Sequence, residues 1–259
     1  MSEIGYTLVV NVGNSNTIFG VFAGDNFMGK WRMETRAERT ADEYGFWLLS
    51  IFEKMNIHAK HIHGVCIATT LPKAEIALTS MALRFFDTPP IIVGAGSKTG
   101  IAINYGRVGD LGPDRLANII ALNNDYKKNA IVVDFGTTTS FDVISNGKYL
   151  GGAVAPGLSL SLSALSGISK TLPDVGFVKP NWVVGKNITH SMQSGCYWGA
   201  VDMVHGLINR IWEDIDTEEG TVIATGGFAN EMAEGVDIFH KVDTNLTLKG
   251  LKLLHDMNL

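Results

Sequence analysis

Two stretches of the chain repeat the same order of apolar and polar positions. Each opens with an apolar run, residues 8–10 in the first and 131–133 in the second, and continues through a glycine-containing polar turn into two more apolar segments. At a constant offset of 123 residues, the difference between positions 134 and 11, Asn11 falls on Asp134 and Gly13 falls on Gly136. Apolar runs bounded by turn residues indicate buried strands. Each stretch therefore predicts three consecutive strands, the third at residues 27–33 and 149–155.

A repeat of this length predicts two similar domains that face each other, rather than a short-period solenoid. Chance resemblance is the alternative. It is disfavoured because the two stretches match in their polar turns as well as in their apolar runs.

Helical patterns follow each set of strands. Thr40 and Glu43 form a capping-box signature. The apolar residues that recur after it at the spacing of one helix face are Tyr44, Trp47, Leu48, Ile51, Phe52 and Met55. Further strands are expected at 65–69, 91–93 and 221–224, and further helices at 73–86 and 192–211. This alternation predicts an α/β fold, with an N-terminal domain at residues 1–115 and a C-terminal domain at residues 116–259.

The composition favours a globular protein with a sizeable core. Of the 259 residues, 46% are hydrophobic and 18% are charged, and the formal net charge is −5, a balance that is unlike that of disordered chains. The chain has no basic clusters and is therefore a poor candidate for binding nucleic acid. No apolar run approaches the roughly 18 residues of a membrane span, and the first residues do not form a signal peptide. We expect a cytoplasmic protein with neither nucleic-acid nor membrane partners.

Two turns carry candidate chemistry. Residues Asn11–Thr17 and Asp134–Thr139 each combine glycine with hydroxyl or amide side chains at a strand end. Small residues let backbone N–H groups point into one concavity, which suits phosphate oxygens, and Asp134 adds a carboxylate that can hold a cation. An ordinary tight hairpin explains each turn taken alone, whereas two facing copies are able to clamp a polyphosphate. Neither turn matches the P-loop or the dinucleotide-binding glycine pattern.

Two more segments allow a structural and a functional interpretation. In Gly112–Arg115, proline suits the first helical turn, and a carboxylate such as Asp114 is stabilised there. The segment is either an ordinary helix start or a general base beside a guanidinium that binds an anionic substrate. Thr225–Gly227 follows a predicted strand. It is either a plain strand-to-helix turn or a flat backbone platform for a nucleotide base.

Taken in order, these segments resemble the type III pantothenate kinases of the actin-like (acetate kinase–hexokinase–Hsp70) superfamily. The stretches that carry the resemblance are Asn11–Thr17, Trp31–Thr35, Asp42–Gly45, Gly112–Arg115, Asp134–Thr139, Gly151–Gly157, Gly185–Gly195, Thr225–Gly227 and Leu246–Leu251. The similarity runs from about residue 7 to about residue 254. It implies duplicated actin-like, ribonuclease H-like domains, each with a mixed sheet flanked by helices.

The resemblance implies ATP-dependent phosphorylation of pantothenate to 4'-phosphopantothenate, the first step of coenzyme A biosynthesis. It also implies a homodimer that uses Mg²⁺ with ATP and a monovalent cation, K⁺ or NH₄⁺. Asp114 would be the catalytic base, and Asp134 would bind metal. The residues implied to bind ATP are Asn11, Val12, Gly13, Asn14, Ser15, Asn16, Thr17, Ile18, Thr137, Thr225, Gly226 and Gly227. Those implied to bind pantothenate are Tyr105, Gly112, Pro113, Asp114, Arg115 and Ile188.

The chain departs from the family pattern at several positions, among them Thr138 in the second turn and the stretch Thr69–Pro72. Two of the departures bear on activity. The aspartate of the first turn is Asn11 here, which removes a charge near Mg²⁺, and the threonine that contacts pantothenate is Ile188. Two functions therefore stay open on the sequence. One is a pantothenate kinase of a divergent branch, which Asp114, Arg115 and Asp134 favour. The other is a paralogue of the same fold that binds nucleotide or pantothenate with weak or no kinase activity, in a regulatory or accessory role.

Overall fold

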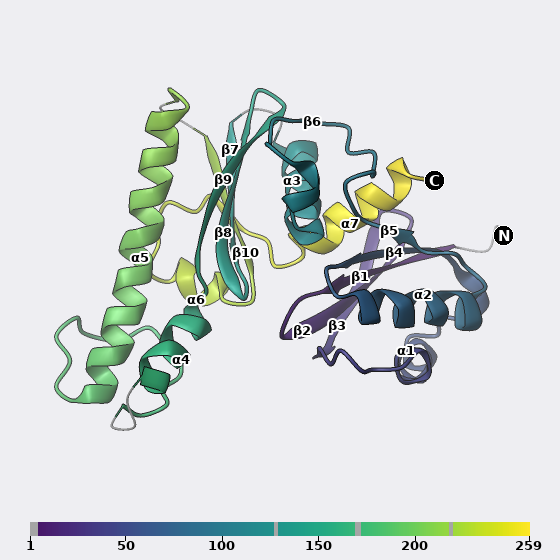
Figure 1. The fold of residues 1–259 in the computed structure, drawn as a ribbon, viewed down its shortest axis with the longest axis horizontal. Coiled ribbons are helices and arrows are strands. Elements are labelled where there is room, and N and C mark those ends of the chain that lie inside the picture. Colours follow the sequence, from purple (N-terminus) through teal and green to yellow (C-terminus); the bar gives the residue numbers. More distant parts are fainter. Residues whose placement is uncertain (1–4, 127–128, 169–171, 218–219) are drawn as a thin grey trace. The chain divides into compact units, whose positions relative to one another are not determined.

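The structure is a computed structural model that describes residues 5–126, 129–168, 172–217 and 220–259. Strands and helices alternate along the chain, as the sequence predicts (Figure 1). The strands are β1 (Tyr6–Val12), β2 (Asn16–Ala23), β3 (Asn26–Glu34), β4 (Ile62–Thr69), β5 (Ile91–Ile92), β6 (Ala102–Ile103), β7 (Ala130–Phe135), β8 (Thr138–Ser145), β9 (Lys148–Pro156), β10 (Thr221–Gly226) and β11 (Lys241–Val242). The α-helices are α1 (Ala41–Lys54), α2 (Pro72–Phe86), α3 (Pro113–Asp125), α4 (Leu158–Ile168), α5 (Ile188–Asp214), α6 (Ala229–Ala233) and α7 (Leu246–Met257). Among the described residues, no helix is long and apolar enough to cross a membrane.

The chain forms two compact units. The first unit holds the chain up to Gly100, together with Gly106–Ala121 and Thr247–Leu259, and the second holds Ile101–Tyr105 and Leu122–Leu246. Helix α3 therefore passes from the first unit to the second after Ala121, and α7 packs with the first unit although it ends the chain. The expected boundary between domains at residues 115 and 116 lies within the same helix and stays a prediction.

The first unit is built on a five-stranded sheet with the strand order β3-β2-β1-β4-β5. Strands β1, β2 and β3 form an antiparallel meander, and β4 and β5 add to it in parallel. Because side chains alternate between the two faces of a strand, Leu8, Val10 and Val12 enter one core cluster together with α1 and α2. Figure 1 shows α1 and α2 on one side of this sheet and α7 on the other.

Helix α7 approaches its neighbours closely at two glycines, one on β4 and one on α7 itself. A side chain at Gly64 on β4 would overlap the imidazole of His255 on α7. A side chain at Gly250 on α7 would overlap the backbone carbonyl of Ala117 on α3. The last helix of the chain is thus an integral part of the first unit.

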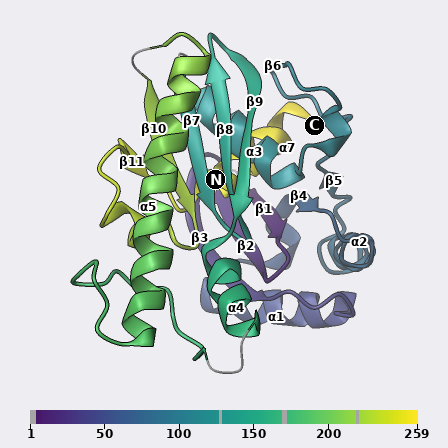
Figure 2. The same ribbon diagram turned by 60° about the vertical axis from the view of Figure 1, so that its left-hand side comes forward.

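The second unit repeats the topology of the first. Its sheet has the order β11-β10-β7-β8-β9-β6. Strands β7, β8 and β9 are an antiparallel meander, β10 and β11 are parallel to β7 and each other, and β6 is an additional edge strand. Figures 1 and 2 both show α5 along one face of this sheet, where its apolar residues join the core cluster of β7, β8 and β10. The predicted duplication of a mixed sheet flanked by helices is therefore confirmed.

Local signals in the sequence also match the structure. Thr40 Oγ1 accepts the Glu43 N–H at 3.2 Å, and the Glu43 carboxylate accepts the Thr40 N–H at 2.7 Å, so the predicted capping box begins α1. Cys66 is buried in β4, and burial raises the pKa of its thiol to about 12. Such a thiol stays protonated and behaves as an inert core group.

Candidate active site

The turn between β1 and β2 forms an exposed loop. The Gly13 N–H donates to the Asn16 carbonyl at 2.9 Å and closes it. The residues exposed at its tip are Asn14, Ser15 and Asn16. Backbone and short polar side chains are therefore accessible at this tip, as phosphate binding by such a turn requires.

The other predicted ATP-binding residues of this segment lie deeper. Val12 belongs to the core cluster of the first unit. Thr17 is fully buried, and its Oγ1 lies 2.9 Å from Thr35 Oγ1. Asn11 and Ile18 are opposite each other in the β1–β2 register, and both are partly buried. Val12 and Thr17 thus support the loop from the inside, and their side chains are not exposed to a ligand.

The turn between β7 and β8 places a carboxylate between two glycines. Asp134 is partly buried near the end of β7. A Cβ placed on Gly136, in the turn, would lie 3.6 Å from Asp134 Oδ1, and a Cβ placed on Gly226 would lie 2.5 Å from the same atom. The carboxylate therefore occupies a space that the glycine at position 226 leaves open.

The Thr225–Gly227 segment ends β10 next to this carboxylate. In the parallel register, Thr225 is opposite Asp134, and the Gly227 N–H donates to the Phe135 carbonyl at 3.0 Å. Gly226 has a φ of +94°, a backbone conformation that residues other than glycine rarely adopt. The carboxyl ends of two parallel strands thus bring Asp134, the β7–β8 turn and Thr225–Gly227 to one edge of the second sheet. This is the edge at which open α/β sheets bind ligands.

Gly157 also contacts the β7–β8 turn, although it was not predicted as a site residue. It directly precedes α4, and a side chain on it would overlap the backbone carbonyl of Thr137. Thr137 itself is exposed. The sequence marks Gly157 only as the last residue of the Gly151–Gly157 stretch that carries the family resemblance, and it does not indicate this contact.

The segment Gly112–Arg115 begins α3, as predicted. Asp114 Oδ1 accepts the Arg115 N–H at 2.8 Å, and a Cβ on Gly112 would lie 2.6 Å from the same oxygen. Both Asp114 and Arg115 are partly buried. A carboxylate in the first turn of a helix is favoured by the unpaired N–H groups there, so the local geometry orients Asp114. Its role as a base stays a prediction.

The remaining predicted pantothenate residues lie in the second unit. The Tyr105 ring packs 5.8 Å from the ring of Tyr149 and beside Gly151. Ile188 is the first residue of α5 and is 50% exposed. Asp114 and Arg115, by contrast, belong to the first unit.

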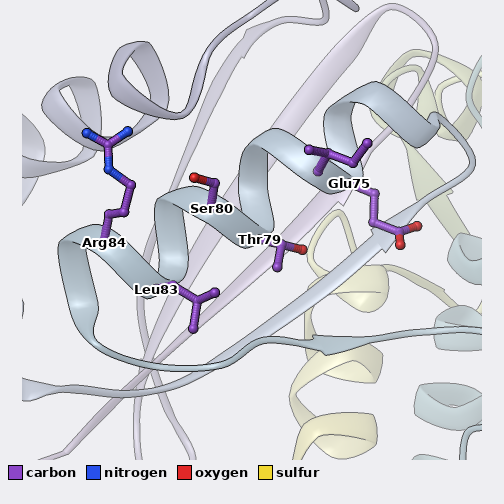
Figure 3. Close-up of a pocket in the computed structure, with 6 residues that line it drawn as sticks. Glu75, Thr79, Ser80, Leu83 and Arg84 are labelled. Atoms are coloured by element: carbon purple, nitrogen blue, oxygen red, sulfur yellow. The ribbon is translucent and has the colours of Figure 1, made fainter.

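A hollow on the outer side of α2 contains none of the predicted site residues. Its lining comes from this single helix (Figure 3) and consists of Glu75, Ile76, Thr79, Ser80, Leu83 and Arg84. Ligand sites are concave and bring a few polar groups together from several elements. Because all the residues that line this hollow lie on α2, no second element contributes polar groups to it. It is therefore not a candidate for the active site.

Solved structures with a similar fold cover nearly the whole chain. A conserved Baf family protein from Campylobacter jejuni matches with a TM-score of 0.60 at 17% identity, over 97% of this chain and 98% of that one. An inorganic polyphosphate/ATP-glucomannokinase from Arthrobacter sp. strain KM matches with a TM-score of 0.51 at 10% identity, over 98% and 100% of the two chains. These similarities establish the duplicated actin-like fold.

Sequence comparison identifies the family. A family model described as type III pantothenate kinase matches residues 7–210. The type III pantothenate kinase of Acidiphilium cryptum (strain JF-5) is 42% identical over 248 residues, which cover 95% of this chain and 93% of the relative. With its loops in the family's order and its fold duplicated as the family implies, the chain belongs to the type III pantothenate kinases.

Proposed function

We propose that the chain catalyses the ATP-dependent phosphorylation of pantothenate to 4'-phosphopantothenate, the first step of coenzyme A biosynthesis. It is then a phosphotransferase with an alcohol acceptor. The observation that carries this proposal is 42% identity with a type III pantothenate kinase over 95% of the chain. Neither the comparisons nor the geometry favours the alternative of a paralogue with weak or no kinase activity.

We assign Asp134 to the binding of a divalent metal ion that accompanies ATP. Mg²⁺ is typically held by one or two carboxylates together with substrate phosphates. Asp134 Oδ1 lies between Gly136 and Gly226, beside the turn that we assign to ATP. This oxygen fits Mg²⁺, and it also suits the K⁺ or NH₄⁺ that we propose as the monovalent cation. Bound metal would neutralise charge on the β- and γ-phosphates.

The two turns hold ATP in this proposal. The exposed tip of the β1–β2 loop and the exposed Thr137 of the β7–β8 turn contact the phosphates. Thr225–Gly227 lies near the adenosine, where the exposed Gly227 offers flat backbone. Phosphoryl transfer depends mainly on positioning and on charge stabilisation, which such turns supply.

Asp114 acts as the general base. The primary hydroxyl of pantothenate attacks the γ-phosphorus, and its proton passes to the Asp114 carboxylate. The new O–P bond forms as the bond between the γ-phosphorus and the β,γ-bridging oxygen breaks, and ADP leaves. The Arg115 guanidinium suits the pantothenate carboxylate, and we also assign Tyr105 to the substrate. The other residues that we assign to pantothenate are Gly112, Pro113 and Ile188.

An assay of the purified chain with ATP, Mg²⁺, K⁺ and pantothenate tests the proposal. We expect ADP and 4'-phosphopantothenate to form in equal amounts, with no ADP when pantothenate is omitted. ATP binding without any phosphorylated product contradicts the proposed activity and favours the inactive paralogue.

We expect Asn11→Asp to lower the Mg²⁺ concentration needed for half-maximal activity and to raise kcat. A carboxylate near Mg²⁺ or its waters adds a full negative charge where asparagine offers only a dipole, and the shape hardly changes. The measurement is kcat across a Mg²⁺ titration. Ile188→Thr is the matched control, because it should change KM for pantothenate and leave the Mg²⁺ dependence alone. An unchanged Mg²⁺ curve for Asn11→Asp means that residue 11 does not act through the metal.

We also propose that the chain works as a cytoplasmic homodimer. Large exposed apolar side chains mark interaction surfaces, and one segment of the second unit is rich in them. They are Val178, Trp182, Val183, Val184 and Ile188, between 45% and 73% exposed. Light scattering should therefore report twice the mass of one chain. A single-chain mass at micromolar concentration contradicts the dimer.

A further inference from the structure

Thr35 contacts the β1–β2 loop through both its side chain and its backbone. It directly follows β3, whose last residue, Glu34, pairs with Asn16. Thr35 Oγ1 donates to the Gly13 carbonyl at 2.8 Å, and the Thr35 N–H donates to the Ser15 carbonyl at 3.0 Å. One residue outside the loop thus binds two carbonyls within it.

A third contact joins Thr35 to the buried Thr17, with 2.9 Å between the two Oγ1 atoms. A threonine hydroxyl has one proton, and that of Thr35 goes to the Gly13 carbonyl. Thr17 must therefore be the donor in this pair. The chain of hydrogen bonds runs from Thr17 through Thr35 to Gly13. Because Thr17 is fully buried, water cannot replace a lost partner in this chain.

These bonds determine the direction of the loop's N–H groups. A peptide group is planar and trans, so the C=O of Gly13 and the N–H of Asn14 point in opposite directions. The same holds for the C=O of Ser15 and the N–H of Asn16. With both carbonyls bound to Thr35, the two N–H groups point away from Thr35. Backbone N–H groups on one side of a turn form an anion-binding concavity.

We infer that Thr35 is a positioning residue for ATP: it holds the β1–β2 loop so that the Asn14 and Asn16 N–H groups face the nucleotide phosphates. The inference rests on the proposed function, which assigns this loop to ATP. Thr35 itself does not touch the substrate in this role.

The test compares Thr35→Val with Thr35→Ser. Valine keeps the shape and the backbone N–H but removes the hydroxyl, whereas serine keeps the hydroxyl. We expect Thr35→Val to raise both the dissociation constant and the KM for ATP about tenfold, equivalent to ~1.4 kcal/mol. KM for pantothenate should stay unchanged. Thr35→Ser should restore wild-type ATP affinity.

Thr88→Val is the matched control for a merely structural effect. Thr88 is a buried threonine of the same unit, and its Oγ1 shares its one proton between the carbonyls of Ile62 and Phe86, at 2.9 and 3.0 Å. Ile62 begins β4 beside the start of β1, at the opposite end of the sheet from the loop. This variant should lose thermal stability and keep its ATP affinity.

Equal ATP affinity in Thr35→Val and the wild type overturns the inference, as does an equal loss of affinity in Thr88→Val. If Thr35→Val does not fold, Thr35→Ala, which removes the same hydroxyl, takes its place and must weaken ATP binding for the inference to stand. Measurements on the wild type distinguish failure of this inference from failure of the proposed function. If the wild type binds ATP but does not phosphorylate pantothenate, the proposed function is refuted, and the comparison of ATP affinities remains valid.

Discussion

Replacing Asp114 with asparagine is expected to lower kcat for phosphorylation of pantothenate by about 10²–10⁴-fold, the usual contribution of a general base. Affinity for ATP should remain close to that of the wild type. Asparagine retains an oxygen that can accept the Arg115 N–H, as Asp114 Oδ1 does at 2.8 Å. The start of α3 is thereby preserved, and the loss reports on proton transfer.

Steady-state kinetics and ATP titration of Asp114→Asn check this result. Asp110→Asn is the control, because Asp110 is an exposed carboxylate shortly before the same helix and has no assigned role. It should leave kcat unchanged. A loss of less than about tenfold in Asp114→Asn would reassign Asp114 to a structural role as a helix cap.

Gly226→Ala should lower the free energy of unfolding by about 2–6 kcal/mol and raise KM for ATP. The backbone at this position has a φ of +94°, which a non-glycine residue adopts only at a cost of about 1–3 kcal/mol. The new Cβ would also lie 2.5 Å from Asp134 Oδ1 and 2.6 Å from the Phe135 backbone N. Phe135 is held in the ladder of β7, so the Asp134 carboxylate must move. Crowding of this kind costs about 1–3 kcal/mol more.

Urea denaturation of the wild type, Gly226→Ala and Gly227→Ala measures the change in the free energy of unfolding that each substitution causes. Gly227 is the matched control, since a Cβ there would meet only the Phe135 carbonyl oxygen, at 3.9 Å. Its substitution should change stability by less than about 0.5 kcal/mol. If the two variants unfold at the same urea concentration, the close approach of β10 to Asp134 does not constrain position 226.

The duplicated strands were predictable because their signal is local. Apolar runs and polar turns at a constant offset identify β1 to β3 and β7 to β9, and the structure extends the third strands by one residue at each end, to Asn26–Glu34 and Lys148–Pro156. Boundaries that depend on pairing or capping were less accurate. Strand β10 continues to Gly226 because its ladder with β7 continues. Helix α5 begins at Ile188 because the Asn187 side chain caps it by accepting the His190 N–H at 2.9 Å.

The site residues, too, fall into those that local sequence signals predict and those that depend on contacts between distant segments. The α/β class, the two glycine turns and the helix start near Asp114 could be predicted from local signals, because strand periodicity, turn chemistry and capping act over a few residues. Three contacts became visible in the folded chain alone: α7 completes the first unit, Gly157 lies against the β7–β8 turn, and Thr35 binds Gly13, 22 residues away along the chain. No periodicity encodes these contacts. They arise because separate elements must pack without voids and satisfy their buried polar groups together.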